Sequence, residues 1–146
     1  MRPFQVREAD LGDAAEIATL VTQLGYDTTA EEMAERLAEL LPDPTYTTFV
    51  AHRLELLGLA GASLSRYFEK NGFYARLVVL VVADAGHGQG IGSALVQAVE
   101  RWAISRGAHE LVVNSGSHRH EAHRFYEGRG FSATGVRFVK QLRAAG

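Results

Sequence analysis

A glycine-rich stretch at residues 86–93, Gly-His-Gly-Gln-Gly-Ile-Gly-Ser, carries the clearest chemical signal in the sequence. An apolar run at residues 74–83 precedes it. Residues with helical spacing follow it: Ile91, Ala94, Leu95, Ala98, Val99 and Trp102. Glycine lets the backbone approach a ligand closely, and the free N–H groups at the start of a helix bind anions. The stretch therefore predicts a phosphate or pyrophosphate site, with a plain strand-to-helix turn as the alternative.

Two well-known phosphate loops fit this stretch poorly. A Walker loop requires Gly-Lys-Ser/Thr, and no lysine lies nearby. A dinucleotide fingerprint belongs early in a parallel βαβ unit, with an acidic residue at the end of the next strand. Here hairpin-like segments come first, and Asn114-Ser115 ends the next apolar run. Another kind of nucleotide-binding enzyme is still an alternative.

The elements that must position this loop follow from periodicity and turn signals. We expect strands at residues 4–7, 47–52, 57–67, 74–83, 111–113 and 137–142. We expect a first helix, capped by Asp10 or Asp13, that runs to about Leu24, and a second helix that starts at Thr28 or Thr29 and runs to about Leu41. Two further helices are expected from Ile91 to Gly107 and over 121–127. Asn71-Gly72 predicts a tight hairpin, and the apolar strand at 74–83 predicts the centre of the sheet. The order indicates one mixed α/β domain spanning residues 1–146.

Residues 87–92, His-Gly-Gln-Gly-Ile-Gly, resemble the Arg/Gln-x-x-Gly-x-Gly/Ala signature of the GNAT N-acetyltransferase superfamily. Three further stretches resemble that superfamily in the expected order. They are residues 6–17 as its opening strand and helix, residues 80–82 as its splayed strand, and residues 122–131 as its late Ala-x-x-Phe-Tyr-x-x-x-Gly-Phe element. The resemblance spans nearly the whole chain. His87 departs from it, because the first signature position is usually Arg or Gln.

The resemblance implies a GNAT-like α/β (α+β) fold, with a mostly antiparallel sheet of about seven strands flanked by about four helices. The sheet would be splayed between the strands near Val82 and Val113, and acetyl-CoA would serve as the acyl donor. Its pantetheine arm would lie in the splay, and its pyrophosphate would rest on N–H groups from Gly88 to Ser93. The expected cofactor-binding residues are Leu80, Val81, Val82, His87, Gly88, Gln89, Gly90, Ile91, Gly92, Ser93 and Asn114.

Amine acetylation requires a neutral amine, a stabilised oxyanion and a protonated leaving thiolate. By resemblance, Tyr126 is the general acid that protonates the thiolate, although it could also be a packing aromatic beside Phe125 and Phe131. The chain has no cysteine, which is consistent with direct transfer in a ternary complex.

The strand before the loop has valine at 78 and 79, where many relatives carry a carboxylate. An acyl-CoA-binding domain without turnover is therefore a further alternative.

The general base has no clear candidate in the sequence. Ordered water could deprotonate the amine, and Glu121, His120 and His123 lie near the expected cleft. His118-x-His120-x-x-His123 is dense in potential metal ligands, but the three do not share a face in one conformation and no carboxylate completes a set. We therefore expect no metal.

Charge is unevenly distributed along the chain. Residues 1–50 carry ten acidic and three basic residues, and the whole chain has a net charge of −2. This balance gives no sign of nucleic-acid binding. The acidic segment predicts a cationic amine acceptor, with a plain solvated helix face as the alternative. The resemblance implies that the acceptor binds between the first two helices, the hairpin at 67–72 and the end of the glycine loop. Whether the acceptor is a small molecule or a peptide is open.

The remaining expectations concern location and assembly. No run of residues is long and apolar enough for a membrane helix, and no signal sequence is evident, which predicts a cytoplasmic protein without a membrane partner. Exposed strand edges in so small a domain are compatible with a homodimer.

Overall fold

The computed structural model describes residues 3–114, 120–135 and 137–142. The chain forms two compact units, Met1–Val113 and Asn114–Gly146. The first unit contains a β-sheet and the helices α1 to α3, and the second contains α4 (His120–Gly128). Among the described residues, no helix has the length and apolar character needed to cross a membrane.

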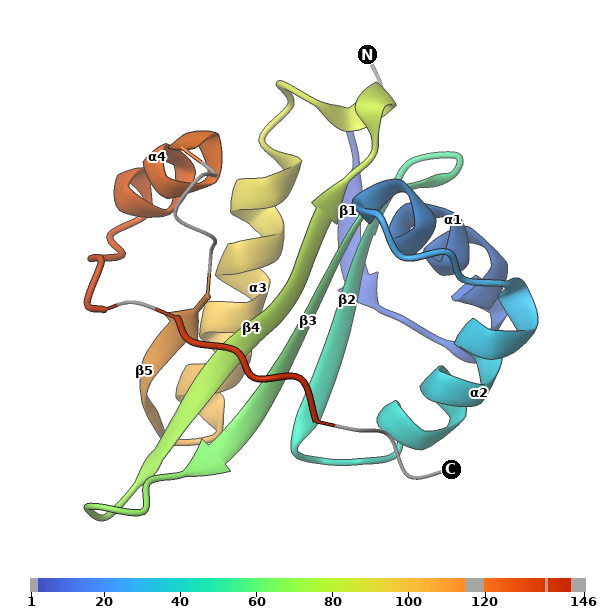
Figure 1. The fold of residues 1–146 in the computed structure, drawn as a ribbon. Coiled ribbons are helices and arrows are strands. Elements are labelled where there is room, and N and C mark those ends of the chain that lie inside the picture. Colours follow the sequence, from blue (N-terminus) through green and yellow to red (C-terminus); the bar gives the residue numbers. More distant parts are fainter. Residues whose placement is uncertain (1–2, 115–119, 136, 143–146) are drawn as a thin grey trace. The chain divides into compact units, whose positions relative to one another are not determined.

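A five-stranded sheet lies at the centre of the first unit (Figure 1). Its strands, in spatial order, are β1 (Gln5–Glu8), β2 (Tyr46–His52), β3 (Leu56–Arg66), β4 (Phe73–Val82) and β5 (Ala108–Val113). Strands β1 to β4 pair antiparallel with their sequence neighbours, and β5 runs parallel to β4. The apolar strand β4 was expected at the centre of the sheet. It is an interior strand, paired on both sides, but the central strand is β3.

The expectation of about seven strands is not borne out, because the described residues form five. The strand expected at residues 137–142 is absent, and this segment has no regular structure. Phe138 is 91% exposed and Leu142 is 81% exposed. A segment forms a strand only where a neighbouring strand supplies hydrogen bonds and a buried face, and the described residues show no strand pairing for residues 137–142.

The connection between β3 and β4 also differs from the expected tight turn. The last paired residues are Arg66 and Phe73, so six residues form the loop. Gly72 has a φ of +109°, whereas no residue other than glycine has positive φ in the described chain. A two-residue Asn-Gly turn of type I′ would place Asn71 at positive φ as well. Gly72 therefore lies in a loop wider than a two-residue turn. The backbone N–H of Tyr67 donates to Gly72 O at 3.2 Å and closes this loop.

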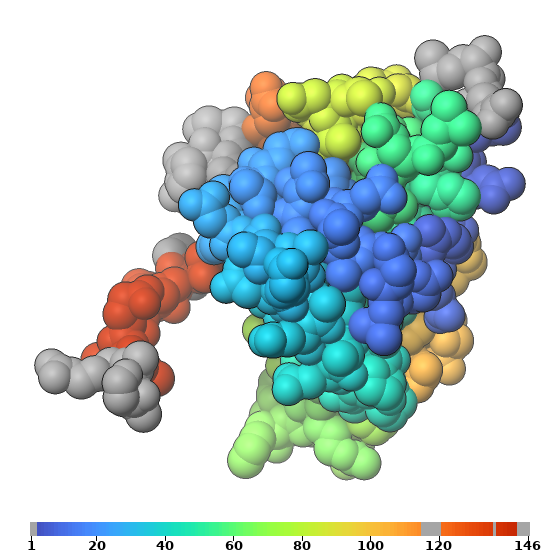
Figure 2. Space-filling model, turned by 90° about the vertical axis from the view of Figure 1, so that its right-hand side faces the viewer, coloured from blue at the N-terminus to red at the C-terminus, as the bar shows by residue number. Residues whose placement is uncertain are grey.

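Helices α1 (Ala14–Leu24) and α2 (Ala30–Leu40) pack together over one face of the sheet, and Figure 2 shows them covering it. Ile17 and Leu37 are 1% and 2% exposed in this core, and burying such a side chain stabilises the fold by about 1.5–3 kcal/mol. Gly25, with a φ of +119°, ends α1. A capping box between Thr29 and Glu32 starts α2.

Helix α3 (Ile91–Ser105) covers the opposite face of the sheet. Its buried residues are Ile91, Leu95, Val96, Ala98, Val99, Trp102 and Ala103. Gly58 of β3 makes room for this helix, because a Cβ built on it would lie 2.9 Å from side-chain atoms of both Ile91 and Leu95. Tight packing at this point fixes the first turn of α3, and the glycine loop leads directly into that turn.

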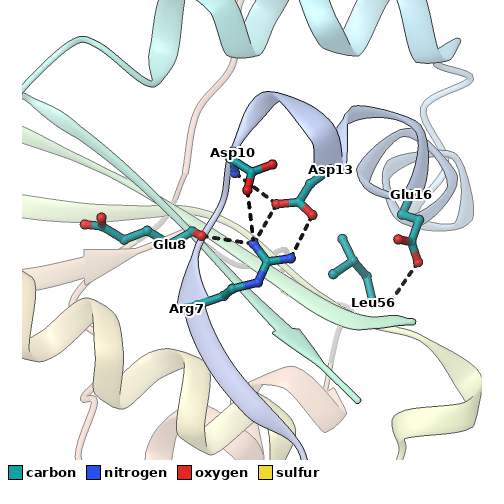
Figure 3. Close-up of polar contacts among 6 residues, drawn as sticks. All are labelled: Arg7, Glu8, Asp10, Asp13, Glu16 and Leu56. Atoms are coloured by element: carbon teal, nitrogen blue, oxygen red, sulfur yellow. Dashed lines mark hydrogen bonds and ion pairs between the residues drawn. The ribbon is translucent and has the colours of Figure 1, made fainter. Parts of the chain in front are cut away.

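An ion pair fixes the start of α1 against the sheet (Figure 3). The Arg7 guanidinium donates to both carboxylate oxygens of Asp13, at 2.8 and 2.9 Å, and the backbone N–H of Asp10 donates to the same carboxylate at 2.9 Å. The hydrogen bonds from Arg7 hold the pKa of the buried Asp13 below its usual value. One turn later, Glu16 accepts a 2.8 Å hydrogen bond from the backbone N–H of Leu56. The carboxylates thus attach α1 to β1 and β3.

The second unit is built around α4. Gly130 has a φ of +92°, and the backbone N–H of Phe131 donates back to the carbonyl oxygen of Tyr126 at 3.0 Å. The rings of Phe125, Tyr126 and Phe131 form an edge-to-face cluster, with centroids 5.3 and 5.5 Å apart on either side of Tyr126.

Candidate functional site

The loop between β4 and α3 has a backbone shape that requires glycine. It begins with a short 3-10 helix, Asp84–Gly86, and ends where α3 starts at Ile91. Gly88 and Gly90 have φ values of +77° and +79°, where any side chain is strained. A Cβ built on either residue would find no neighbouring atom within 4 Å. Backbone conformation rather than packing therefore selects these two glycines, and the space beside them is open.

The start of α3 presents unpaired backbone donors to this open space. The first hydrogen bond of the helix runs from Ala94 N to Gly90 O at 3.0 Å, so the amides of Ile91, Gly92 and Ser93 have no acceptor within the helix. In the part of the chain that the structure describes, no side chain caps these donors, and the first turn holds no acidic residue. Free N–H groups at the positive end of the helix dipole suit an anion.

The strand that leads into the loop has a free edge. Strand β5 pairs with β4 only as far as Leu77, which lies opposite Val113. Val78–Val82 continue beyond this point without a strand partner on that side in the described chain. This region contains Leu80, Val81 and Val82, the strand residues expected to contact a cofactor. The free edge offers backbone hydrogen bonds to a ligand in the way that a sheet edge accepts another strand.

The carbonyl group of Val82 points toward this free edge. Ala83 N donates to Leu57 O of β3 at 2.8 Å, and successive residues of a strand direct their hydrogen-bonding groups to opposite sides. Val82 O accepts hydrogen bonds from His87 Nε2 at 3.1 Å and from Gln23 Nε2 of α1 at 3.2 Å. The ring of His87, one of the expected cofactor-binding residues, thus lies on this carbonyl at the end of β4.

Gln89 links the loop to the turn between β2 and β3. Its Nε2 donates to Ala85 O at 2.7 Å, and its Oε1 accepts a hydrogen bond from the Arg53 guanidinium. In Figure 2 this turn and the glycine loop lie side by side along the upper edge of the first unit. Arg53 was not among the residues expected at the site. A register argument could have indicated it, because the start of β3 must lie beside the end of β4 in an antiparallel pair.

Tyr126, the expected general acid, lies on α4 in the second unit, where its ring is half-buried between those of Phe125 and Phe131. Asn114 follows the last residue of β5 and is exposed. Of the groups considered as a base, Glu121 is exposed and His123 is half-buried. The side chain of His120, together with Ser115 and residues 117–119, lies outside the described residues. Within those residues, no group of three or more His, Cys, Asp or Glu is placed to hold a metal ion.

Strand β4 carries no carboxylate near the loop. Val78, one of the two positions where many relatives carry an acid, is 52% exposed. At Val79, the Cγ1 atom lies 2.9 Å from a Cβ built on Gly61, so this side chain packs against β3. Neither side chain can accept a proton, and the structure therefore shows no strand-borne base at these positions.

Comparison with known proteins identifies the chain's relatives. The model of the acetyltransferase (GNAT) family matches residues 14–131. Aminoglycoside N(6')-acetyltransferase type 1 of Klebsiella aerogenes is 33% identical over 117 residues, which cover 75% of this chain and 77% of that protein. Aminoalkylphosphonate N-acetyltransferase of Salmonella typhimurium is 26% identical over 140 residues, which cover 94% and 91%.

The fold also matches solved structures. An aminoglycoside N-acetyltransferase in complex with CoA superimposes with a TM-score of 0.87 at 19% identity, and the match covers 99% of this chain and 97% of that one. A GNAT family acetyltransferase from Staphylococcus aureus superimposes with a TM-score of 0.81 at 23% identity, covering 97% and 100%. At these sequence identities, the structural likeness supports the assignment of the fold alone.

Proposed function

The chain belongs to the GNAT acetyltransferase family and is an acyltransferase, and we propose that it transfers an acetyl group from acetyl-CoA to a primary amine in a ternary complex. The observation that carries this proposal is the continuity of two features in the first unit. The free edge of β4, Val78–Val82, leads directly into the glycine loop and the uncapped start of α3. Acetyl-CoA combines an amide-containing arm with a pyrophosphate, so one extended molecule matches both features.

The pantetheine arm of acetyl-CoA would lie along the free edge of β4, beside Leu80, Val81 and Val82. Its amides can pair with strand backbone in the manner of an added strand. Val82 O already accepts from Gln23 and His87, and a carbonyl oxygen has two lone pairs. A pantetheine N–H that donates to this oxygen therefore displaces one of the two side chains. The pyrophosphate would rest on the amides from Gly88 to Ser93.

Direct transfer needs no protein nucleophile, which is consistent with a chain that lacks cysteine. The amine nitrogen attacks the thioester carbonyl carbon, and the C–S bond breaks when the tetrahedral intermediate collapses. Tyr126 would donate its phenolic proton to the leaving sulfur. The amine would lose its proton through ordered water, since β4 has no carboxylate at Val78 or Val79. Asn114 would contribute a hydrogen bond to the cofactor at the end of β5.

The acceptor proposed here is a cationic amine of the aminoglycoside class, in keeping with the name of the Klebsiella aerogenes relative. Glu31, Glu35 and Glu39 are exposed on α2. Hydrogen bonds from Thr29 lower the pKa of Glu32, which keeps this carboxylate charged as well. Like charges would repel an acidic amine such as an aminoalkylphosphonate. Charge complementarity therefore favours a polycationic acceptor.

An amine panel with acetyl-CoA, read by the release of free CoA thiol, tests this function. We expect turnover with aminoglycosides and polyamines that exceeds turnover with acidic amines at low salt. Replacing both Glu35 and Glu39 with Gln should raise the KM for a cationic acceptor about threefold to tenfold, since exposed charge pairs contribute modestly. Added salt should reduce this difference because it screens exposed charges.

Glu8→Gln is the matched control, because it removes an exposed carboxylate from β1 and should leave the KM unchanged. No acetylation of any amine would overturn the enzymatic proposal. Preferential acetylation of acidic amines, insensitive to salt, would overturn only the assignment of the acceptor.

A further inference from the structure

Arg53 lies at the glycine loop although it is distant from the loop in sequence. It belongs to the turn between β2 and β3. The antiparallel register of β3 and β4 places Gly58 opposite Val82, so the start of β3 reaches the same end of the sheet as the loop. The Arg53 guanidinium donates to Gln89 Oε1, and Gln89 in turn donates to Ala85 O at 2.7 Å. The β2–β3 turn and the loop are thus joined by side-chain hydrogen bonds.

The charge of Arg53 is not neutralised within the described chain. The ion pairs of the described residues join Arg7 to Asp10 and to Asp13, and none involves Arg53. Its Nε atom is buried and has no hydrogen-bond partner. Among the described residues, the side chain that it contacts by a hydrogen bond is the neutral amide of Gln89. A guanidinium is always charged and offers five donors, so most of its binding capacity is unused in this arrangement.

We propose that Arg53 provides the positive charge that binds the phosphates of CoA at the glycine loop. The inference rests on the proposed function. It explains how the site can bind phosphate although His87 occupies the first signature position, where Arg or Gln is usual. The His87 ring is engaged with Val82 O, and an imidazole has two ring nitrogens, whereas a guanidinium offers five N–H donors. Backbone amides of the loop supply hydrogen bonds but only partial charge. Arg53 adds a full charge, and Gln89 holds the guanidinium beside the loop until phosphate replaces its weaker amide contact.

Titration calorimetry with CoA tests the role of Arg53 in the full-length protein. Arg53→Gln should raise the Kd for CoA about tenfold to a hundredfold, the range expected for hydrogen bonds to a charged group. Arg53→Lys retains the charge and should stay within about fivefold of the wild type. The Kd of Arg53→Gln should also depend less steeply on salt, because one charge no longer contributes.

Arg101→Gln is the matched control, since it removes the same charge from an exposed position of α3 and should leave the Kd unchanged. Melting temperatures of all variants identify any folding defect. If Arg53→Gln does not fold, Arg53→Met, which keeps a long apolar stem, replaces it and should show the same loss.

Two results would overturn the inference. One is an unchanged Kd and salt dependence in the neutral variants. The other is an equal loss in Arg53→Lys and Arg53→Gln, which would mean that the hydrogen bond to Gln89 matters rather than the charge. Wild-type protein that does not bind CoA would instead contradict the proposed function itself, so the two failures are distinguishable.

Discussion

Gly90→Asp is expected to weaken acetyl-CoA binding at least about a hundredfold while the protein stays folded. The substituted side chain would enter the open space beside the loop, where a Cβ at residue 90 meets no atom within 4 Å. There its carboxylate would accept hydrogen bonds from the free amides at the start of α3 and would occupy the proposed phosphate site. It would also repel phosphate, and two like charges about 4 Å apart near a protein surface interact by about 4 kcal/mol.

Gly90→Asn tests whether the effect of Gly90→Asp on binding comes from the charge of the new side chain or from its size. Asn matches Asp in size, and both residues tolerate the left-handed conformation better than other side chains at the φ of +79° that Gly90 adopts. We expect the Asn variant to bind acetyl-CoA much more tightly than the Asp variant. Calorimetric titration of both variants measures this difference, and circular dichroism confirms folding. Wild-type affinity in a folded Asp variant would place the cofactor elsewhere.

Tyr126→Phe is expected to reduce kcat about a hundredfold, the usual contribution of a general acid. The substitution keeps the ring that packs between Phe125 and Phe131 at centroid distances of 5.3 and 5.5 Å, so stability should change little. Proton transfer to the thiolate follows cofactor binding, and the Kd for acetyl-CoA should therefore stay near that of the wild type. Steady-state kinetics with the best acceptor of the amine panel, together with calorimetry, measures both quantities.

Tyr46→Phe provides the corresponding control. Tyr46 is 39% exposed at the start of β2, and loss of its hydroxyl group should not alter kcat. Wild-type kcat in Tyr126→Phe would reduce Tyr126 to a packing residue. A matching loss of kcat in both variants would show that the effect is not specific to the proposed acid.

The glycine loop was predictable because the spacing of its glycines indicates a particular backbone conformation. Gly88 and Gly90 adopt positive φ, which few other residues tolerate, and the helical periodicity that follows them places the start of α3. The order of helices and strands through residue 113 was also predictable, since each element buries an apolar face with its own period. Membership in the GNAT family followed from the same motifs and is confirmed by the family match.

Features that depend on tertiary pairing were not predictable from local pattern. Residues 137–142 were expected to form a strand, yet a strand needs a partner, and the described chain shows no pairing for this segment. Arg53 reaches the loop only through the register of β3 with β4. The His87 ring could have faced either phosphate or backbone, and the choice depends on the position of Val82 O. These outcomes depend on which elements become neighbours.

Thermal unfolding with candidate ligands tests most directly whether the loop and the free edge of β4 bind acetyl-CoA. At a concentration about a hundred times the Kd, acetyl-CoA should stabilise the folded protein by about 2.7 kcal/mol. That gain corresponds to a rise in Tm of about 5–10 °C for a chain of this size. NAD and ATP at the same concentration should leave the Tm unchanged, because neither molecule has a pantetheine arm that could pair with the free edge of β4. A rise in Tm with NAD or ATP, and none with acetyl-CoA, would contradict the account.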